Sequence, residues 1–178
     1  MLRIITGTKK GKKLFTLEGE ATRPTSERIK GAMFSSIQFD IEYRRVLDLF
    51  AGSGQLGIEA LSRGAKSATF VDSSNASIKI IKQNIESTGL GDNAKVYMSD
   101  YSSFTAMCRD TFDIVFLDPP YLKGLLLPAL KAVLPLMSDY GIIVCEYPPE
   151  VEIPQEIAGF VVAKTYRVSG IGCSQFRQ

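Results

Sequence analysis

Residues 48–57 read Asp48-Leu-Phe-Ala-Gly52-Ser-Gly54-Gln-Leu-Gly57. An apolar run over residues 46–50 predicts a strand before the glycines, and residues 55–63 predict a helix after them. Glycines between a strand and a helix permit a tight turn and let a ligand approach the backbone beside the helix N-terminus. Asp72 follows Gly52 by twenty residues, at the end of the next apolar run. A carboxylate at this position accepts hydrogen bonds from ribose hydroxyls, so the pattern predicts a nucleotide-type cofactor site.

Two cofactor classes fit this loop: a dinucleotide such as NAD, and S-adenosylmethionine. Asp48 would repel a pyrophosphate but suits a ligand that carries a cationic amino group. Asp100 ends the third predicted strand, where it can accept a hydrogen bond from an adenine amino group. Each aspartate could equally be a helix cap or a loop acid. Together they favour the methyl donor.

From residue 45 onward the sequence pattern predicts strands that alternate with helices. Further strands are predicted over residues 68–71, 94–98, 112–117 and 142–145, with helical spacing of Ile78, Ile81 and Ile85 between them. This alternation predicts an α/β fold with a mostly parallel, Rossmann-like sheet and right-handed crossovers. Residues 160–168 and 173–177 predict a closing hairpin, which adds an antiparallel strand.

The amino-terminal part differs in charge from the rest. It is predicted to form a hairpin from Leu2–Thr6 and Lys13–Leu17, then a helix over residues 26–38 capped by Thr25. Residues 1–45 hold ten basic and five acidic side chains, so the remainder carries a net −3 of the overall +2. A basic end on a slightly acidic body indicates a polyanionic partner, while a solvated lysine-rich turn is the alternative.

Absent residue types exclude several chemistries. The 178 residues contain no histidine, which excludes Ser-His-Asp and Cys-His catalysis and every histidine-containing zinc site. Cys108, Cys145 and Cys173 form no CxxC pair, so neither a disulfide framework nor a zinc knuckle is indicated. The first residues lack the apolar region of a signal peptide, and no apolar run is long enough to span a bilayer. We expect a cytoplasmic protein with no metal and no membrane contact.

The fourth predicted strand runs into Asp118-Pro119-Pro120-Tyr121. Because the prolines lack N–H groups, this turn presents acceptors only: the Asp118 carboxylate and the Pro119 carbonyl. Tyr121 offers a flat face on which a base can stack. Such a site matches the exocyclic amino group of a nucleobase, which donates two hydrogen bonds.

These motifs resemble a known family. The Pro-Pro turn together with residues 50–54 is similar to class I S-adenosylmethionine-dependent methyltransferases that act on amino groups. Residues 23–28, residues 48–65 and the amino-terminal hairpin resemble, more narrowly, the bacterial 16S rRNA guanine-N2 methyltransferase family called RsmD. The resemblance covers nearly the whole chain. Gln55 stands where that family usually has Ala, and Asp72 where Glu is common.

The resemblance implies a set of roles. A methyltransferase domain over residues 41–178 would follow an RNA-gripping extension over residues 1–40. The methyl donor would be held by Asp48, Phe50, Gly52, Gly54, Asp72 and Asp100. The catalytic residues would be Asp118, Pro119 and Tyr121. The RNA would be gripped by Lys9, Lys10, Lys12, Lys13, Arg23 and Arg28.

The implied reaction is methyl transfer to the 2-amino group of a guanine in 16S rRNA, carried out by a monomer on a small-subunit ribosomal particle. Adenine-N6 methylation suits the same acceptors, and a silent RNA-binding assembly factor would share the basic hairpin and the fold. A nicotinamide oxidoreductase would share the glycine loop but leaves Asp48 and the Pro-Pro turn unexplained. Glu146 and Tyr147 end the fifth predicted strand, where they could line the pocket or serve the strand end alone.

Overall fold

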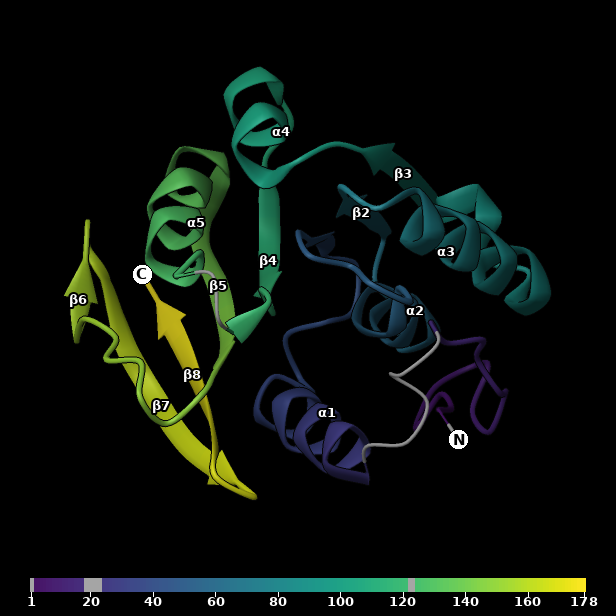
Figure 1. Cartoon of the computed structure of the whole chain (residues 1–178), viewed down its shortest axis with the longest axis horizontal. Coiled ribbons are helices and arrows are strands. Elements are labelled where there is room, and N and C mark those ends of the chain that lie inside the picture. Colours follow the sequence, from purple (N-terminus) through teal and green to yellow (C-terminus); the bar gives the residue numbers. More distant parts are fainter. Residues whose placement is uncertain (1, 18–23, 122–123) are drawn as a thin grey trace.

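An eight-stranded sheet forms the centre of the computed structural model, which describes residues 2–17, 24–121 and 124–178 (Figure 1). The strand order is β3-β2-β1-β4-β5-β8-β7-β6. β1 to β5 pair in parallel, whereas β8 is antiparallel to β5 and to β7. The strands are β1 (Arg45–Asp48), β2 (Ser67–Asp72), β3 (Ala94–Met98), β4 (Phe112–Leu117), β5 (Met137–Tyr147), β6 (Glu156–Ile157), β7 (Phe160–Val168) and β8 (Ile171–Arg177).

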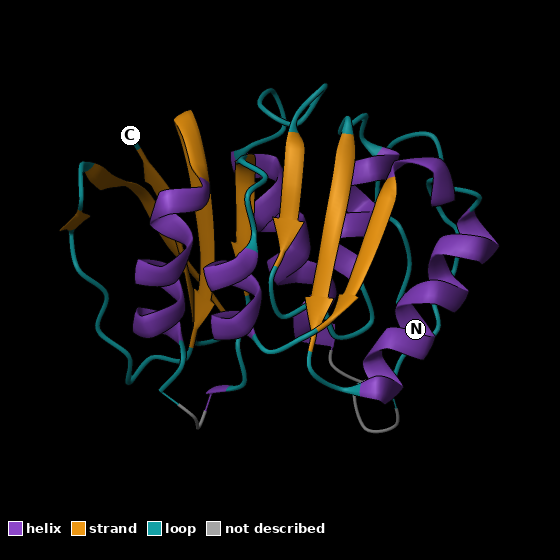
Figure 2. Ribbon diagram, turned by 90° about the horizontal axis from the view of Figure 1, so that it is seen from above, coloured by secondary structure: helices purple, strands orange, loops and turns teal. Residues whose placement is uncertain are grey.

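Helices cover both faces of the sheet (Figure 2). They are α1 (Pro24–Ser36), α2 (Gln55–Ser62), α3 (Asn75–Thr88), α4 (Tyr101–Met107) and α5 (Leu126–Val133), with short 3-10 turns η1 (Gly91–Asn93) and η3 (Leu134–Leu136). Side chains alternate along each strand, so Ile114 and Phe116 pack with α1 to α3 while Val115 and Leu117 pack with α4 and α5. Among the residues that the structure describes, no helix has the length and apolarity needed to cross a membrane.

The predicted α/β sheet is confirmed, and most differences lie at strand ends. β3, β4 and β7 have the predicted bounds. β5 is longer than predicted because it extends on both sides of the apolar run at residues 142–145. β6 was not predicted, since its two residues carry no alternating pattern.

The amino-terminal hairpin is much shorter than predicted. Its arms run antiparallel but share only one β-bridge, Arg3 to Lys13, in the described part of the chain. The arms bond each other through the backbone N–H groups of Ile4 and Leu14, whereas side chains of the body accept other N–H groups of the arms. The Glu59 carboxylate accepts the N–H groups of Ile5 and Thr6 at 2.8 and 3.0 Å, and Asn84 Oδ1 accepts that of Phe15 at 2.7 Å.

Glu59 also anchors the extension by charge. It lies fully buried on α2, with Lys30 Nζ of α1 at 3.4 Å from Oε2 and Arg63 Nε at 2.8 Å from Oε1. Lys30 is 1% exposed, and its Nζ also donates to the carbonyl of Arg3 at 2.6 Å. Apolar residues of the extension, Leu2 and Leu14 among them, share one core with α2 and α3. The described part of the extension is therefore packed into the body.

α1 begins two residues earlier than predicted. The helix includes Pro24 and Thr25, so the prediction of Thr25 as the N-cap is wrong. Proline suits the first helical position because its fixed φ is helical and its missing N–H would have no partner there.

β8 occupies an interior place in the sheet although it follows β7 in the chain. It pairs with β5 on one side and with β7 on the other, so that among the described residues β7 and β6 join the parallel part of the sheet through β8. A row of hydroxyls crosses the three strands: Tyr147 Oη lies 2.7 Å from Ser174 Oγ, which lies 2.8 Å from Thr165 Oγ1.

Candidate active site

The glycine loop has the predicted shape. Gly52 and Gly54 adopt φ of 54° and 77°, in the left-handed region that favours glycine, and Gly54 precedes the first turn of α2. Two carboxylates hold this loop. Asp48 Oδ2 accepts the N–H of Gly57 at 3.0 Å, and Asp72 Oδ2 accepts that of Gly52 at 2.9 Å. The loop and the ends of β1 and β2 are thereby fixed together.

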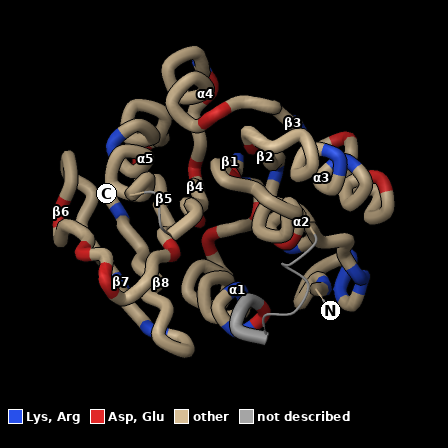
Figure 3. The backbone as a smooth tube through the Cα atoms, in the orientation of Figure 1, with Lys and Arg blue, Asp and Glu red and all other residues tan. Residues whose placement is uncertain are grey.

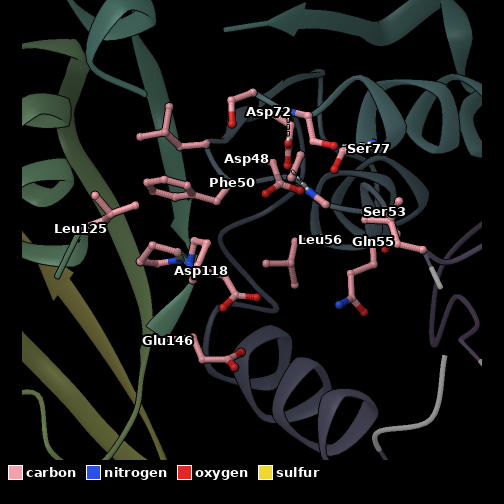
Figure 4. A pocket seen from close by; sticks show the side chains of 18 of the residues that line it. Asp48, Phe50, Ser53, Gln55, Leu56, Asp72, Ser77, Asp118, Leu125 and Glu146 are labelled. Carbon is pink, nitrogen blue, oxygen red and sulfur yellow. Dashed lines mark hydrogen bonds between the residues drawn. The ribbon is translucent and has the colours of Figure 1, made fainter. Parts of the chain in front are cut away.

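A cavity of about 1070 Å³ lies at the carboxyl ends of the parallel strands (Figure 4). This is the edge at which open α/β sheets bind their ligands. Its volume lies just above the roughly 300–1,000 Å³ usual for small-molecule sites. The predicted site residues that line it are Asp48, Phe50, Gly52, Asp72, Asp100, Asp118, Pro119 and Tyr121.

Asp48 is the most deeply placed of these carboxylates. It is 1% exposed, and burial raises the pKa of its carboxyl to about 7. The N–H of Gly57 works against this rise in pKa, and the charge of Asp72 adds to it. A cationic group entering the cavity would offset the cost of ionising Asp48.

Asp72 and Asp100 each serve the backbone as well as lining the cavity. Asp72 Oδ1 accepts the N–H of Ser74 at 2.8 Å. Asp100 is the N-cap of α4: its Oδ1 accepts the N–H of Ser103 at 2.9 Å and the hydroxyl of Ser102 at 2.7 Å. These hydrogen bonds, that of the Ser103 N–H foremost, hold the pKa of Asp100 well below its ordinary value. The cap and lining roles coexist because a carboxylate has about four acceptor sites.

Asp118, Pro119 and Tyr121 come together at the end of β4. Asp118 points into the cavity in Figure 4, and Pro119 is buried. The hydroxyl of Tyr121 donates to Glu146 Oε1, and burial followed by this bond raises the pKa of Tyr121. Tyr121 is therefore a neutral phenol whose orientation is fixed by Glu146.

Some lining residues were not expected from the sequence. Ser53, Ser77 and Gln55 line the cavity, and Gln55 Oε1 is buried with no hydrogen-bond partner among the described residues. From the sequence, Gln55 stood out only because the RsmD family usually has Ala at this position. Glu146 lines the cavity as considered, whereas Tyr147 lies on the opposite face of β5.

The predicted RNA-gripping residues within the described part of the chain do not line the cavity. Arg23 lies outside the described residues, and Arg28 is exposed on α1. The four lysines occupy the turn that contacts Ser62, where Lys9 N donates to Ser62 Oγ at 3.0 Å, and this turn is basic in Figure 3. Ser62 ends α2, so this turn lies one helix length, about 12 Å, from the glycine loop. The extension reaches the cavity through Leu2, Thr16 and Leu17 instead.

Nothing in the described residues forms a metal centre. No group of three or more Cys, Asp and Glu side chains is arranged to hold an ion within residues 2–17, 24–121 and 124–178. Cys108, Cys145 and Cys173 are free thiols, and burial raises the pKa of each.

Comparison with known proteins identifies the family. The family model "Conserved hypothetical protein 95" matches residues 2–177. The chain is 40% identical to YlbH from Bacillus subtilis (strain 168) over 181 residues, which cover 96% of each chain. It is 37% identical over 140 residues to ribosomal RNA small subunit methyltransferase D from Escherichia coli (strain K12), covering 79% of this chain and 68% of that one.

A solved structure agrees over the whole fold. That of yhhF from Escherichia coli superposes with a TM-score of 0.87 at 31% identity, covering 99% of this chain and 97% of that one. The chain therefore belongs to the conserved hypothetical protein 95 family, together with ribosomal RNA small subunit methyltransferase D, and it is a methyltransferase.

Proposed function

We propose that this enzyme transfers the methyl group of S-adenosyl-L-methionine to the exocyclic 2-amino group of a guanine in 16S rRNA. The observation that carries the proposal is the acceptor-only turn at Asp118 and Pro119, which shares one cavity with the buried carboxylate of Asp48. Relatives named for methylation of small-subunit ribosomal RNA support the choice of substrate.

The cavity residues fit the methyl donor by their chemistry. The buried Asp48 carboxylate binds the cationic amino group, because the two charges neutralise each other away from water. Asp72 accepts from the ribose hydroxyls and Asp100 from the adenine amino group, both through acceptor sites that the backbone N–H groups leave available. Gly52 lets the ligand approach the backbone, and Gly54, which faces the core and does not line the cavity, shapes the turn behind it. Phe50, whose ring is 5.7 Å from that of Tyr101, supplies an apolar wall.

S-adenosyl-L-methionine, when bound, supplies an electrophilic methyl group on sulfur. Asp118 and the Pro119 carbonyl accept the two N–H bonds of the target amino group, which aims the nitrogen lone pair at that methyl group. Tyr121 stacks on the flipped-out base. The new N–C bond forms as the bond from the methyl carbon to sulfur breaks, and the excess proton then passes from the nitrogen to the Asp118 carboxylate and on to water, so no histidine is needed. Positioning and fixed acceptors supply most of the rate enhancement.

The amino-terminal extension is the part of the enzyme that binds the RNA in this proposal. Residues 1–40 grip the RNA, with the basic side chains of the turn on phosphates, while residues 41–178 carry the reaction. The enzyme acts as a monomer on a small-subunit particle in the cytoplasm, without a metal ion and without contact with a membrane.

The test is transfer of tritium from labelled S-adenosyl-L-methionine to small-subunit particles that lack the modification, followed by mapping of the methylated base. Asp118→Ala is expected to lower transfer by about 100-fold or more, because one of the fixed acceptors is lost, and to leave the affinity for S-adenosyl-L-methionine nearly unchanged.

Asp110→Ala is the matched control, since Asp110 is an exposed carboxylate in a surface pair with Lys95. Wild-type turnover by Asp118→Ala would sink the proposal. Cofactor binding without any transfer by the wild type would instead favour a silent RNA-binding factor.

A further inference from the structure

A second carboxylate stands beside Asp118 in the cavity. Leu117 of β4 is in parallel register with Cys145 of β5. The residue that follows Leu117 is Asp118, and the residue that follows Cys145 is Glu146. Neighbouring strands lie about 4.8 Å apart, and side chains in register point to the same face. Figure 4 shows both carboxylates projecting into the cavity from adjacent strand ends. Two acidic groups therefore present acceptors side by side.

Glu146 is held in this position. Its Oε1 accepts the hydroxyl of Tyr121, from the same turn as Asp118. Its partner in register on β8 is Cys173, so the strand that carries it is paired on both sides. Glu146 and Tyr121 also line a smaller cavity of about 250 Å³ behind the turn, so they form part of the wall between the two cavities.

The two purine bases differ at the atom that such a pair of acceptors would meet. Guanine carries an N1–H donor directly beside its 2-amino group. Adenine carries an N1 lone pair beside its 6-amino group. When Asp118 and the Pro119 carbonyl bind the amino group, the neighbouring ring nitrogen N1 faces the next acceptor, which is the Glu146 carboxylate. A carboxylate there makes a charge-assisted hydrogen bond with guanine and repels the lone pair of adenine.

We propose that Glu146 is the residue that selects guanine, by accepting the N1–H of the base whose amino group is methylated. This assignment rests on the proposed function, because it requires that the amino group be held by Asp118 and Pro119. It explains how an acceptor turn suited to either amino group serves one base.

The experiment uses small-subunit particles rebuilt with 16S rRNA that is ligated from segments. The position that the wild type methylates carries guanosine or 2-aminopurine ribonucleoside, which keeps the 2-amino group but has a lone pair at N1. The wild type is expected to prefer guanosine strongly. Glu146→Gln is expected to lower the rate on guanosine roughly 10- to 100-fold, because it loses a hydrogen bond to a charged group. The same variant should reduce the ratio of the rate on guanosine to the rate on 2-aminopurine by at least about tenfold, because the amide can donate a hydrogen bond to N1 of 2-aminopurine.

Two further variants separate selection from structure. Glu146→Asp keeps the charge and is expected to keep the preference for guanosine at a reduced rate. Glu152→Gln changes a carboxylate that lines only the smaller cavity, and it should match the wild type. If Glu146→Gln lowers the rate equally on guanosine and on 2-aminopurine, the assignment of Glu146 is overturned while the proposed function stands. No transfer to guanosine by the wild type would overturn the proposed function, and the assignment with it.

Discussion

Asp48 combines deep burial with a place at the cavity wall, and its titration therefore reports on ligand binding. The pKa of Asp48 is about 7 in the folded protein, raised by burial from an ordinary value of 3.8. A cationic amino group binds the ionised carboxylate, so the protonated form must first release its proton. Affinity for the ligand then rises about tenfold per pH unit below pH 7 and levels off above it.

We predict that the affinity for S-adenosyl-L-methionine increases more than about tenfold between pH 5.5 and 7.5, measured by isothermal titration calorimetry. Asp48→Asn should bind weakly, with little dependence on pH. A wild-type pH profile in Asp48→Asn would show that another group controls the affinity.

The same residue affects folding stability with a definite sign. Because the folded-state pKa of Asp48 lies above the unfolded value, its contribution to stability is full below about pH 4 and is lost as pH rises through 7. Asp48→Asn should therefore melt no lower than the wild type at pH 8, which also shows that its weak ligand binding is not a folding defect. A lower melting temperature at that pH would contradict this account of Asp48.

At the scale of the element, the contact of α2 with the sheet allows no side chain at Gly57. A Cβ added there would lie 2.3 Å from the ring of Phe70, which is fully buried and cannot yield. We predict that Gly57→Ala lowers the free energy of unfolding by about 1–3 kcal/mol, measured by urea denaturation. Because α2 starts at the glycine loop, the affinity for S-adenosyl-L-methionine should fall as well.

Gly31 in α1 provides the matched control. A Cβ there would meet only Ile5 Cδ1, at 3.9 Å. Gly31→Ala should stabilise the protein by about 0.5–1 kcal/mol, since alanine loses less conformational entropy in a helix. Equal effects of the two substitutions would mean that the contact with Phe70 does not limit the packing of α2.

The success of sequence-based prediction depends on how local the determining contacts are. The turns at Gly52 and Asp118 could be predicted because glycine permits left-handed backbone angles and proline fixes φ where it stands. The docking of the extension on the body could not, because the N–H groups of Ile5 and Phe15 bond side chains 54 and 69 residues away. Glu146 could be placed at a strand end from the sequence, but its position beside Asp118 depends on the register between β4 and β5, which the sequence does not encode locally.

At the scale of the whole molecule, the basic turn and the cavity lie at opposite ends of α2, so RNA that reaches both spans the extension and the body. We predict that replacing Lys10, Lys12 and Lys13 with Gln weakens binding of 16S rRNA and lowers the slope of log K against log salt by about 2. The reason is that fewer counterions are released from phosphates. Filter binding over a series of salt concentrations measures both quantities.

Lys79 and Lys82, exposed on α3, give a control triple change together with Lys131 of α5. If this control lowers the slope as much as the turn variant does, the grip is a diffuse charge effect and the extension has no special part in it.

The place of β8 sets an order of events during synthesis of the chain. β7 leaves the ribosome before β8, yet it joins the sheet only through β8. Until β8 emerges, the edge of β5 stays uncovered, and β7 can pair only with the two-residue strand β6. The sheet is therefore complete only after β8 has been inserted between β5 and β7, and the edge of β5 stays open to other pairings until then.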